Sequence, residues 1–275
     1  MKNLLNLSVA IITKNEQEMI AGCLESVSWA KDIIVIDAQS SDKTVDIAKK
    51  YTKRVFVKKW TGFANQKNFA IQKAQHDWIL VLDADERVSG SLRQEIANVL
   101  DSQPNVQAFD MPLINYFLGK RMNYGGWQYD KVTRLIKKNV RYADQQIHEY
   151  LDITGPTGHL SSPLYHFSHR DISSNLLKTK QYAELEAHYH YIRNSPRVTE
   201  WTLCKGVFQH FWQRYVQHKG YKDGMEGFVE AMYQAFSYVF IIQAMLWEKQ
   251  RGKTSKQLYA ALDDKLKNNR FILET

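Results

Sequence analysis

Three acidic residues stand together at the end of an apolar run in residues 78–86, WILVLDADE. Asp83, Asp85 and Glu86 would repel one another at the tip of a packed strand unless a positive charge held them there. An Asp-X-Asp alternation at a strand end suits a divalent cation that bridges a diphosphate, because Mg²⁺ and Mn²⁺ prefer oxygen ligands from one or two carboxylates plus substrate phosphates. An isolated Asp-X-Asp is more often an exposed loop or a helix N-cap. The apolar strand before the acids and the helix expected after them favour a metal site with Asp83 and Asp85 as ligands.

The elements that must position these acids alternate along the first hundred residues. Short β-rich runs are separated by stretches with helical spacing. Continuous apolar strands joined by helical crossovers predict an α/β fold with a parallel, nucleotide-binding sheet that is covered on both faces. The expected strands are 7–13, 32–37, 54–57 and 77–83, and the expected helices are 16–29, 42–51, 63–75 and 90–100.

Two further regions follow residues 1–105. Residues 106–170 combine aromatics, glycines and short alternating segments, which predicts additional strands and long loops over one edge of the sheet. Helical periodicity dominates residues 171–275 and predicts three or four helices. Because no Pro/Gly-rich linker separates the regions, we expect layers of one compact body.

Polar residues gather near the predicted strand ends, where an open parallel sheet binds its ligands. They are Lys14, Asn15 and Glu16 after the first strand, Asp37 at the end of the second, residues 65–68 in the helix before the fourth, and residues 83–85 at its end. The chain has neither G-x-x-x-x-G-K-[ST] nor G-x-G-x-x-G, which disfavours kinases, ATPases and Rossmann dehydrogenases. A nucleotide would therefore be held by metal and side chains.

The segment DAQSSDKT, residues 37–44, also has an ordinary interpretation. Ser41 can cap the following helix, and Asp42 complements the helix dipole. Asp37 differs, because a carboxylate at the strand end could accept from the N–H of a pyrimidine base.

Composition agrees with a soluble globular protein: 44% of the 275 residues are hydrophobic and 24% are charged. The two cysteines give no disulfide framework, and the apolar N-terminus is better interpreted as a first buried strand than as a signal peptide. A net charge of +8 suits polyanionic partners, namely nucleic acid, an anionic membrane or phosphate-bearing small molecules. No basic-aromatic recognition element supports nucleic acid, so we expect none to bind.

Together, SVAIITKNE, IIVIDAQSSDKT, NQKNFAI and WILVLDADE resemble the family 2 glycosyltransferases of the GT-A fold, and among these the lipopolysaccharide core β-glucosyltransferases. The resemblance is strong over residues 6–100. It continues more weakly to about residue 250 through VTRLIKKN, QQIHEYL, LYHFSHRD and GMEGF.

The resemblance implies an inverting transfer of a sugar from a nucleotide diphosphate donor, with UDP-glucose expected, to a lipid-linked glycan such as the lipopolysaccharide inner core. Mg²⁺ or Mn²⁺ is the expected cofactor. The two cysteines fit a reducing cytosol, so the expected location is cytoplasmic, and the C-terminal helix described below predicts peripheral contact with the inner membrane. Asp85 matches the principal metal ligand, and Asp83 the acid near the ribose and the metal. The donor-binding residues implied are Thr13, Asn15, Glu16, Asp37, Lys67, Asn68, Asp83 and Arg134.

An inverting displacement needs a base that takes the proton from the acceptor hydroxyl. His148-Glu149 in QQIHEYL resembles the His-Glu variant of this branch, so Glu149 is the candidate base and His148 a candidate for acceptor binding. Asp144 and Asp130 are rivals in the same region, and Glu149 could also be a solvated loop acid.

A histidine of LYHFSHRD matches the third metal ligand of some GT-A enzymes. We favour His166 over His169, because His166 directly ends an apolar segment. Arg134 and Lys137 could neutralise the diphosphate or could be surface charges.

Three other functions compete. A nucleotidyltransferase would show a glycine- and arginine-rich loop after the first strand, where this chain has TKNEQEMI. A non-catalytic nucleotide-sugar-binding module is disfavoured by the intact Asp83, Asp85 and Glu149. A transferase for another surface polysaccharide stays open.

The stretch 231–247, AMYQAFSYVFIIQAMLW, has few polar residues and predicts either a core helix or a helix that docks on a membrane. Its acidic start, Glu226 and Glu230, makes insertion costly. The basic residues around it suit an anionic surface; they are Arg214, Lys219, Lys222, Lys249, Arg251, Lys253 and Lys256.

Overall fold

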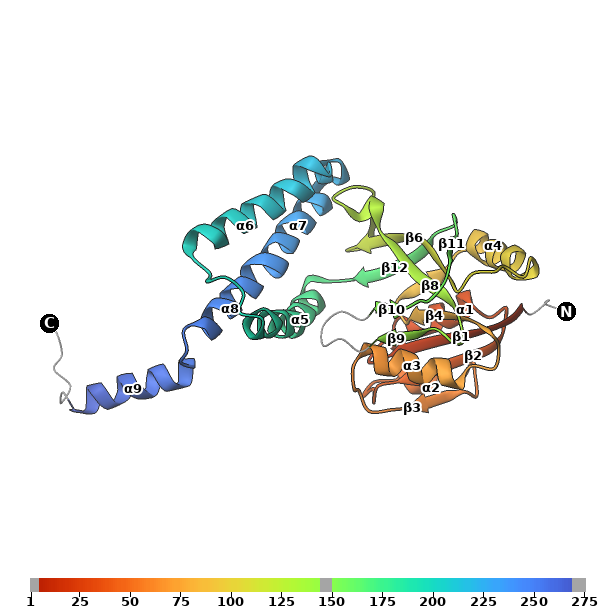
Figure 1. The fold of residues 1–275 in the computed structure, drawn as a ribbon, viewed down its shortest axis with the longest axis horizontal. Helices are drawn as coiled ribbons and strands as arrows, with labels where there is room; N and C mark the ends of the chain where they lie inside the picture. The colour runs from red at the N-terminus through yellow and green to blue at the C-terminus, as the bar shows by residue number, and fades with distance from the viewer. Residues whose placement is uncertain (1–4, 144–149, 269–275) are drawn as a thin grey trace.

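The computed structural model describes residues 5–143 and 150–268. Figure 1 shows two parts beside each other: an α/β body that contains the large sheet, and a helical arm, α5–α9, that leads away from the sheet towards the C-terminus.

The N-terminal half of the body has the predicted parallel arrangement. β1 (Leu5–Thr13) pairs in parallel with β2 (Ala30–Asp37) on one side and β4 (Trp78–Asp83) on the other, and β3 (Val55–Val57) lies beyond β2. The α/β fold expected from the alternating pattern is therefore confirmed.

The helices of this half cover both faces of the sheet. Ile20 and Ile96 belong to one buried apolar cluster with the odd-numbered positions of β1, whereas Ile71 belongs to a second cluster with the even-numbered positions. The helices are α1 (Ile20–Ser26), α2 (Thr44–Ala48), α3 (Phe63–Lys73) and α4 (Gly90–Asp101).

The strand register brings the polar strand ends together. Thr13 lies opposite Asp37, and Ile12 lies opposite Asp83. Since all three strands run in the same direction, their carboxyl ends form one edge, as the sequence predicted.

Further strands extend the sheet beyond β4, in the order β4-β8-β6-β12-β5. In the register of β12, His166 is opposite Asn115 of β6 on one side and Glu86 of β5 on the other. Residues 86 to 169 contain β5 (Glu86–Val88), β6 (Ala108–Phe117), β7 (Lys120–Arg121), η1 (Trp127–Tyr129), β8 (Lys131–Lys137), β9 (Arg141–Ala143), β10 (Tyr150–Asp152), β11 (Thr157–His159) and β12 (Leu164–His169).

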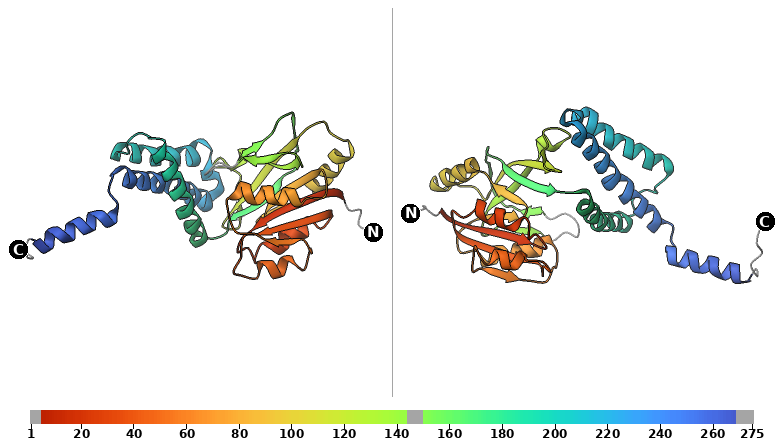
Figure 2. Two further views of the ribbon diagram at one scale, coloured as in Figure 1. Left: turned by 60° about the horizontal axis from the view of Figure 1, so that its bottom comes forward. Right: turned by 180° about the vertical axis from the view of Figure 1, so that it is seen from behind.

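The arm is helical, as predicted, but it is not a layer over the sheet. Figure 2 shows that α6, α7 and α8 lie beside the body and that α9 projects beyond them. The expectation of one compact body is therefore not met. The arm comprises α5 (Ile172–Ile192), α6 (Glu200–Trp212), η2 (Gln213–Gln217), η3 (Gly220–Asp223), α7 (Gly224–Gln234), η4 (Ala235–Ile241), α8 (Ile242–Gln250) and α9 (Ser255–Asn268).

Asp223 joins the arm to the body. Its Oδ2 accepts hydrogen bonds from the backbone N–H groups of Asn123 and Tyr124, at 3.0 and 2.8 Å. Lys120 donates to the carboxylate of Glu226 at 2.9 Å. These contacts fix the loop that carries Trp127 and Asp130 towards the site described below.

One helical run in the described part of the chain, Gly220–Gln250, is 31 residues long and apolar enough to cross a membrane by length and composition, a test that a core helix also passes. In its first half the polar side is turned inward: Glu230, Gln234 and Ser237 are buried. Met225 and Met232 are 69% and 47% exposed.

Candidate functional site

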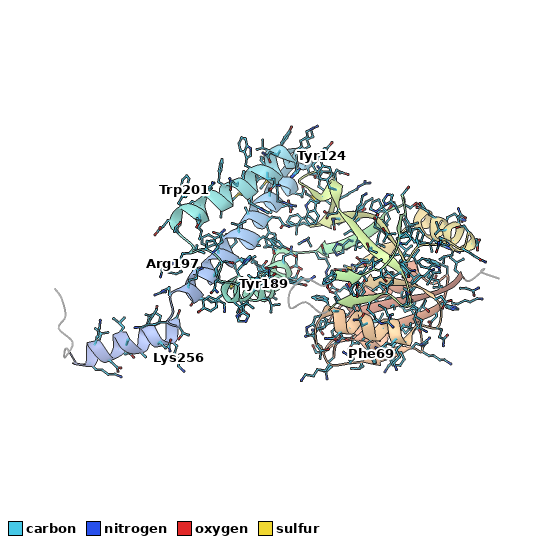
Figure 3. All side chains as sticks on the ribbon, viewed as in Figure 1. Phe69, Tyr124, Tyr189, Arg197, Trp201 and Lys256 are labelled. Carbon is cyan, nitrogen blue, oxygen red and sulfur yellow. The ribbon has the colours of Figure 1, made fainter. Side chains whose placement is uncertain are left out.

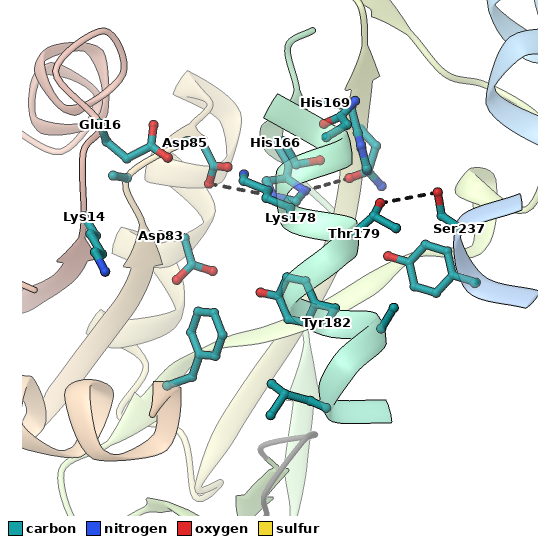
Figure 4. A pocket seen from close by; sticks show the side chains of 18 of the residues that line it. Lys14, Glu16, Asp83, Asp85, His166, His169, Lys178, Thr179, Tyr182 and Ser237 are labelled. Carbon is teal, nitrogen blue, oxygen red and sulfur yellow. Dashed lines mark hydrogen bonds and ion pairs between the residues drawn. The ribbon is translucent and has the colours of Figure 1, made fainter. Parts of the chain in front are cut away.

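A cavity of about 760 Å³ opens at the carboxyl edge of β1 and β4, between the body and α5. Figure 4 shows its acidic side chains facing those of β12 and α5. Many of the residues singled out in the sequence line it: Thr13, Glu16, Asp83, Asp85, Asp130, His166 and His169. Asn15, Asp37, Lys67, Asn68 and Arg134 lie outside that lining.

Two of the three acids at the tip of β4 are neutralised by one buried arginine. Arg134 Nη2 lies 2.6 Å from Asp83 Oδ2 and 2.6 Å from Glu86 Oε1. Lys67, which is 2% exposed, lies 3.6 Å from Asp83 Oδ1. Burial alone would raise the pKa of Asp83, but the cations of Arg134 and Lys67 hold that pKa well below its usual range. Burial raises the pKa of Glu86, and the cation of Arg134 opposes that rise.

Arg134 is thus an internal ion-pair partner and not a surface charge. Its guanidinium is already used by Asp83 and Glu86, so it acts on the site through those acids. Lys137 lies far from these acids. In the register of β8 against β4 it is opposite Trp78, the first residue of β4, which is about 17 Å from the end of β4 that carries Asp83. The idea that Lys137 neutralises a diphosphate at this edge is therefore wrong.

The third acid, Asp85, faces a histidine. Asp85 Oδ1 lies 3.7 Å from His166 Nε2. The other ring nitrogen of His166 is 2.8 Å from Asn115 Oδ1, and Asn115 Nδ2 donates to Asp130 Oδ2 at 2.8 Å. Because the carboxylate of Asp130 accepts from the amide nitrogen, the amide oxygen of Asn115 is left to accept from His166 Nδ1–H. The lone pair of His166 Nε2 is then directed towards Asp85.

These donors fit a hard divalent cation. Two ligands of one Mg²⁺-sized ion, each at about 2.0–2.1 Å, lie at most about 4.2 Å apart, and Asp85 and His166 satisfy that limit. A histidine ligand whose second nitrogen is fixed by a polar neighbour is the usual arrangement at metal sites. No group of three His, Cys, Asp or Glu side chains suited to a metal is found among the described residues, so Asp83, Asp85 and His166 do not form a closed set.

The residues after β1 and β2 hold one another in place. Asp37 is buried and accepts hydrogen bonds from Ser40. The prediction that Ser41 caps the next helix is wrong: α2 begins after Lys43, the Ser41 hydroxyl donates to Asn15 Oδ1, and Asp42 accepts from the N–H of Thr44.

Glu16 reaches the cavity from the loop after β1. It lies 2.9 Å from Arg170, which follows β12. Burial raises the pKa of Glu16, and the neighbouring Arg170 opposes that rise.

Asn68 has a structural role on α3. Its side-chain amide donates to the backbone carbonyl of Tyr142 at 2.7 Å and accepts from the Tyr142 N–H at 2.9 Å. The ring of Tyr142 in turn lies 5.2 Å from Lys67 Nζ. This pairing fixes β9 against α3 and keeps Lys67 beside Asp83.

The predicted base Glu149, the predicted acceptor contact His148 and the rival Asp144 lie outside the described residues. The rival Asp130 lies inside them, and burial raises its pKa. The two short strands β9 and β10, which flank residues 144–149, are paired.

Several cavity residues were not singled out by the sequence pattern. They come from β6, η1, β12 and α5, far apart along the chain, and are Asn115, Trp127, Ser168, Asn175 and Lys178. Only their adjacency to VTRLIKKN or LYHFSHRD could have pointed to them.

A model of the family described as glycosyl transferase family 2 matches residues 8–161, which is more than half of the chain. The chain belongs to glycosyl transferase family 2. The match spans the parallel strands, the acids at the end of β4 and Arg134.

Curated relatives match over most of their length. A lipopolysaccharide core biosynthesis glycosyltransferase, LpsC of Rhizobium meliloti, is 26% identical over 94% of this chain and 98% of its own. An uncharacterized glycosyltransferase of Rickettsia prowazekii is 29% identical over 84% of this chain and 83% of its own. Among solved structures, that of S. aureus TarS 1–349 in complex with UDP-GlcNAc covers 90% of this chain and 93% of its own, at 12% identity and a TM-score of 0.46.

Proposed function

We propose that this glycosyltransferase is metal-dependent and inverting, and that it moves a sugar, glucose from UDP-glucose, to a hydroxyl of a lipid-linked glycan such as the lipopolysaccharide inner core. The observation that carries the proposal is the placement of Asp85 opposite His166 on the wall of one cavity, beside an Asp83 that is already neutralised. The relationship to LpsC supports the acceptor class.

Mg²⁺ or Mn²⁺ held by Asp85 and His166 would supply positive charge to the diphosphate leaving group. Asn115 and Asp130 orient His166, and Arg134 with Lys67 keeps Asp83 ionised without drawing on the metal. Asp85 is thus the acid left free to face the donor.

In the displacement, the acceptor oxygen forms a bond to the anomeric carbon while the bond from that carbon to the diphosphate oxygen breaks. The acceptor proton passes to a carboxylate, for which Glu149 is the proposed base. His148 is proposed to contact the acceptor. Asp130 stays the rival base, because it lines the cavity and burial raises its pKa, which makes its carboxylate a stronger proton acceptor.

A lipid-linked acceptor requires the enzyme to work at a membrane surface, and we assign that contact to the arm. On α7 the usual amphipathic order is reversed, since Glu230 is buried against Arg214 at 2.6 Å while Met225, Phe228 and Met232 face outward. The acidic start of this helix is therefore no obstacle to docking, because its second acid, Glu230, is turned inward and paired.

The outward apolar surface continues onto α6. Trp201 is 72% exposed and lies on the outer side of α6 (Figure 3). Phe208 is 63% exposed and stacks on Trp212, and Phe211 contacts Phe228 of α7. An exposed apolar surface of this kind marks a membrane or protein contact.

Basic residues favour an anionic membrane as the partner. Lys205, Lys219 and Lys222 are exposed on or next to this surface. Each such cation contributes about 1 kcal/mol near anionic lipid, so several hold a protein there reversibly. Arg214, by contrast, forms an ion pair with Glu230, so we do not count it among the cations that face the lipid. The enzyme would then be cytoplasmic and peripheral on the inner membrane.

Hydrolysis of donors in the absence of acceptor tests the catalytic proposal. A set of nucleotide sugars would be incubated with the full chain and Mg²⁺ or Mn²⁺. We expect UDP release from UDP-glucose that stops when the metal is chelated. Equal UDP release with and without chelator would contradict metal dependence. Release from another nucleotide sugar alone would show that UDP-glucose is not the donor.

A further inference from the structure

The cavity has a second lobe on the side away from β1, between β12, α5 and η4. Figure 4 shows His169, Thr179 and Ser237 on this side, across the cavity from Glu16 and Asp83. Trp127 enters from η1 and Tyr233 from α7, so aromatic rings form part of its wall.

Three polar side chains that line this lobe carry buried atoms without a well-formed hydrogen bond to a described residue, although the side chains of His169 and Asn175 are close enough to interact. The atoms are Ser168 Oγ, His169 Nδ1, and both Nδ2 and Oδ1 of Asn175. Asn175 is only 1% exposed. Buried polar groups in native proteins are almost always paired, so unpaired donors and acceptors on one cavity wall mark a place where a ligand or water supplies the partners.

Aromatic rings surround His169 in this lobe. The His169 ring lies among the rings of Phe117, Trp127 and Tyr233, with centroids 5.7, 5.7 and 6.2 Å away. Burial lowers the pKa of His169 to about 4, so its imidazole is neutral at physiological pH. A neutral imidazole, an amide and a hydroxyl between aromatic walls offer both donors and acceptors, which is the chemistry that hydroxyl groups on a ring require.

One cation stands at the rim of the lobe. Lys178 is exposed on α5, and among the described residues no carboxylate lies within 4 Å of its ammonium. Lys180, two positions later, is also exposed but does not line the cavity.

We propose that this lobe is the acceptor subsite: Ser168, His169 and Asn175 bind the hydroxyls of a sugar ring, and Lys178 binds an anionic substituent such as phosphate on the same glycan. The assignment rests on the proposed function, in which the donor binds on the acidic side of the cavity and leaves this lobe for the acceptor. Ser237 lines the lobe from the run of helix whose opposite side carries the exposed apolar residues. An acceptor held in the lobe would therefore be close to a docked membrane.

The test uses the water-soluble, phosphorylated core oligosaccharide that is left when the acyl chains of lipopolysaccharide are removed. Its binding to the full chain would be measured by calorimetry without donor, and donor hydrolysis would be measured separately. For Asn175→Leu and Ser168→Ala we expect about ten- to hundredfold weaker binding and unchanged donor hydrolysis. Asn98→Leu, an exposed asparagine on α4, is the control and should change neither.

Thermal stability separates a binding role from a structural one. Because neither polar atom of the Asn175 side chain makes a well-formed hydrogen bond to a described residue, Asn175→Leu should change Tm little. A Tm lower by more than about 4 °C would show that Asn175 stabilises the fold, which overturns its assignment.

Lys178→Gln should weaken binding of the phosphorylated oligosaccharide and leave binding of the phosphatase-treated one unchanged, whereas Lys180→Gln should affect neither. Wild-type protein that hydrolyses donor but does not bind the oligosaccharide would overturn the subsite and leave the proposed function standing. Oligosaccharide binding without any donor hydrolysis would overturn the proposed function and leave the subsite standing. Equal binding by Asn175→Leu and wild type would also overturn the subsite.

Discussion

His166 Nε2 lies 3.7 Å from Asp85 Oδ1, although His166 is on β12 and Asp85 lies in the turn between β4 and β5, far away in the sequence. That distance is too long for a hydrogen bond and short enough for two ligands of one ion. The relationship exists because β12 inserts between β6 and β5, which places His166 level with the residue after Asp85. The site is therefore assembled by the late strands as much as by the acidic tip of β4.

Removing Arg134 should strongly destabilise the fold. Arg134→Met leaves the buried Glu86 without its cation and Asp83 with Lys67 alone, and loss of one member of a buried ion pair typically costs about 3–5 kcal/mol. Urea unfolding measures the effect. Lys137→Met, at the end of the same strand, is the control and should cost much less. A loss below about 1 kcal/mol for Arg134→Met would mean that the acids find other partners.

Stability should fall as the pH falls from about 6.5 to about 4 because of His169. Its folded pKa is lowered by burial to about 4, so the unfolded chain binds a proton in that range while the folded chain does not. At about 1.4 kcal/mol per pKa unit, the loss approaches 3 kcal/mol. Urea unfolding of wild type and His169→Gln at pH 7 and pH 4.5 tests this. The variant should lose less on acidification, whereas His188→Gln, on the exposed side of α5, should behave as wild type. Identical losses in His169→Gln and wild type would disprove the assignment.

Glu149→Gln should slow transfer without weakening the donor complex. General-base catalysis contributes about 10²–10⁴-fold, so kcat should fall by that factor while the Kd for UDP stays the same. Asp130→Asn is the comparison. It should disturb the hydrogen bonds that orient His166 through Asn115, and so raise the metal concentration needed for half-maximal activity. If instead kcat is within threefold of wild type for Glu149→Gln and collapses for Asp130→Asn, Asp130 is the base.

Membrane docking should depend on the outer surface of α6 and α7. Wild-type protein should sediment with anionic vesicles at low salt and be released as the salt concentration rises. The double variant Trp201→Ser/Phe208→Ser should bind much less. Val57→Ser, which removes a side chain 60% exposed on β3 of the body, is the matched control. No binding of wild type at low salt would contradict membrane docking by this surface.

Much of the donor side was predictable because it is local. Each parallel strand is an apolar run that ends in a polar residue, and parallel pairing of neighbours then places Thr13, Asp37 and Asp83 at one edge. The pairing of Glu86 with Arg134 joins residues 48 positions apart, and no periodicity reports such a contact.

The arm shows a second limit. Helical periodicity separates the polar side of α7 (Glu230, Gln234) from the apolar side (Met225, Met232), but it does not say which side faces the protein. The rule that apolar residues are inside would have given the wrong answer, because the partly buried Arg214 and the cavity accept the polar side. Ser41 was misassigned for a similar reason, since its hydroxyl donates to Asn15 from another loop and the helix begins later, after Lys43.

The most direct test of the central claim is a titration of UDP into wild type and Asp85→Asn, with Mn²⁺ and with chelator. The substitution keeps the shape of the side chain and removes its charge. The account predicts that Mn²⁺ tightens UDP binding to wild type by about tenfold or more, equivalent to about 1.4 kcal/mol, and has no effect on the variant. Asp101→Asn, at the end of α4, should match wild type. Equal tightening by Mn²⁺ in wild type and Asp85→Asn, or no tightening in either, would contradict the account.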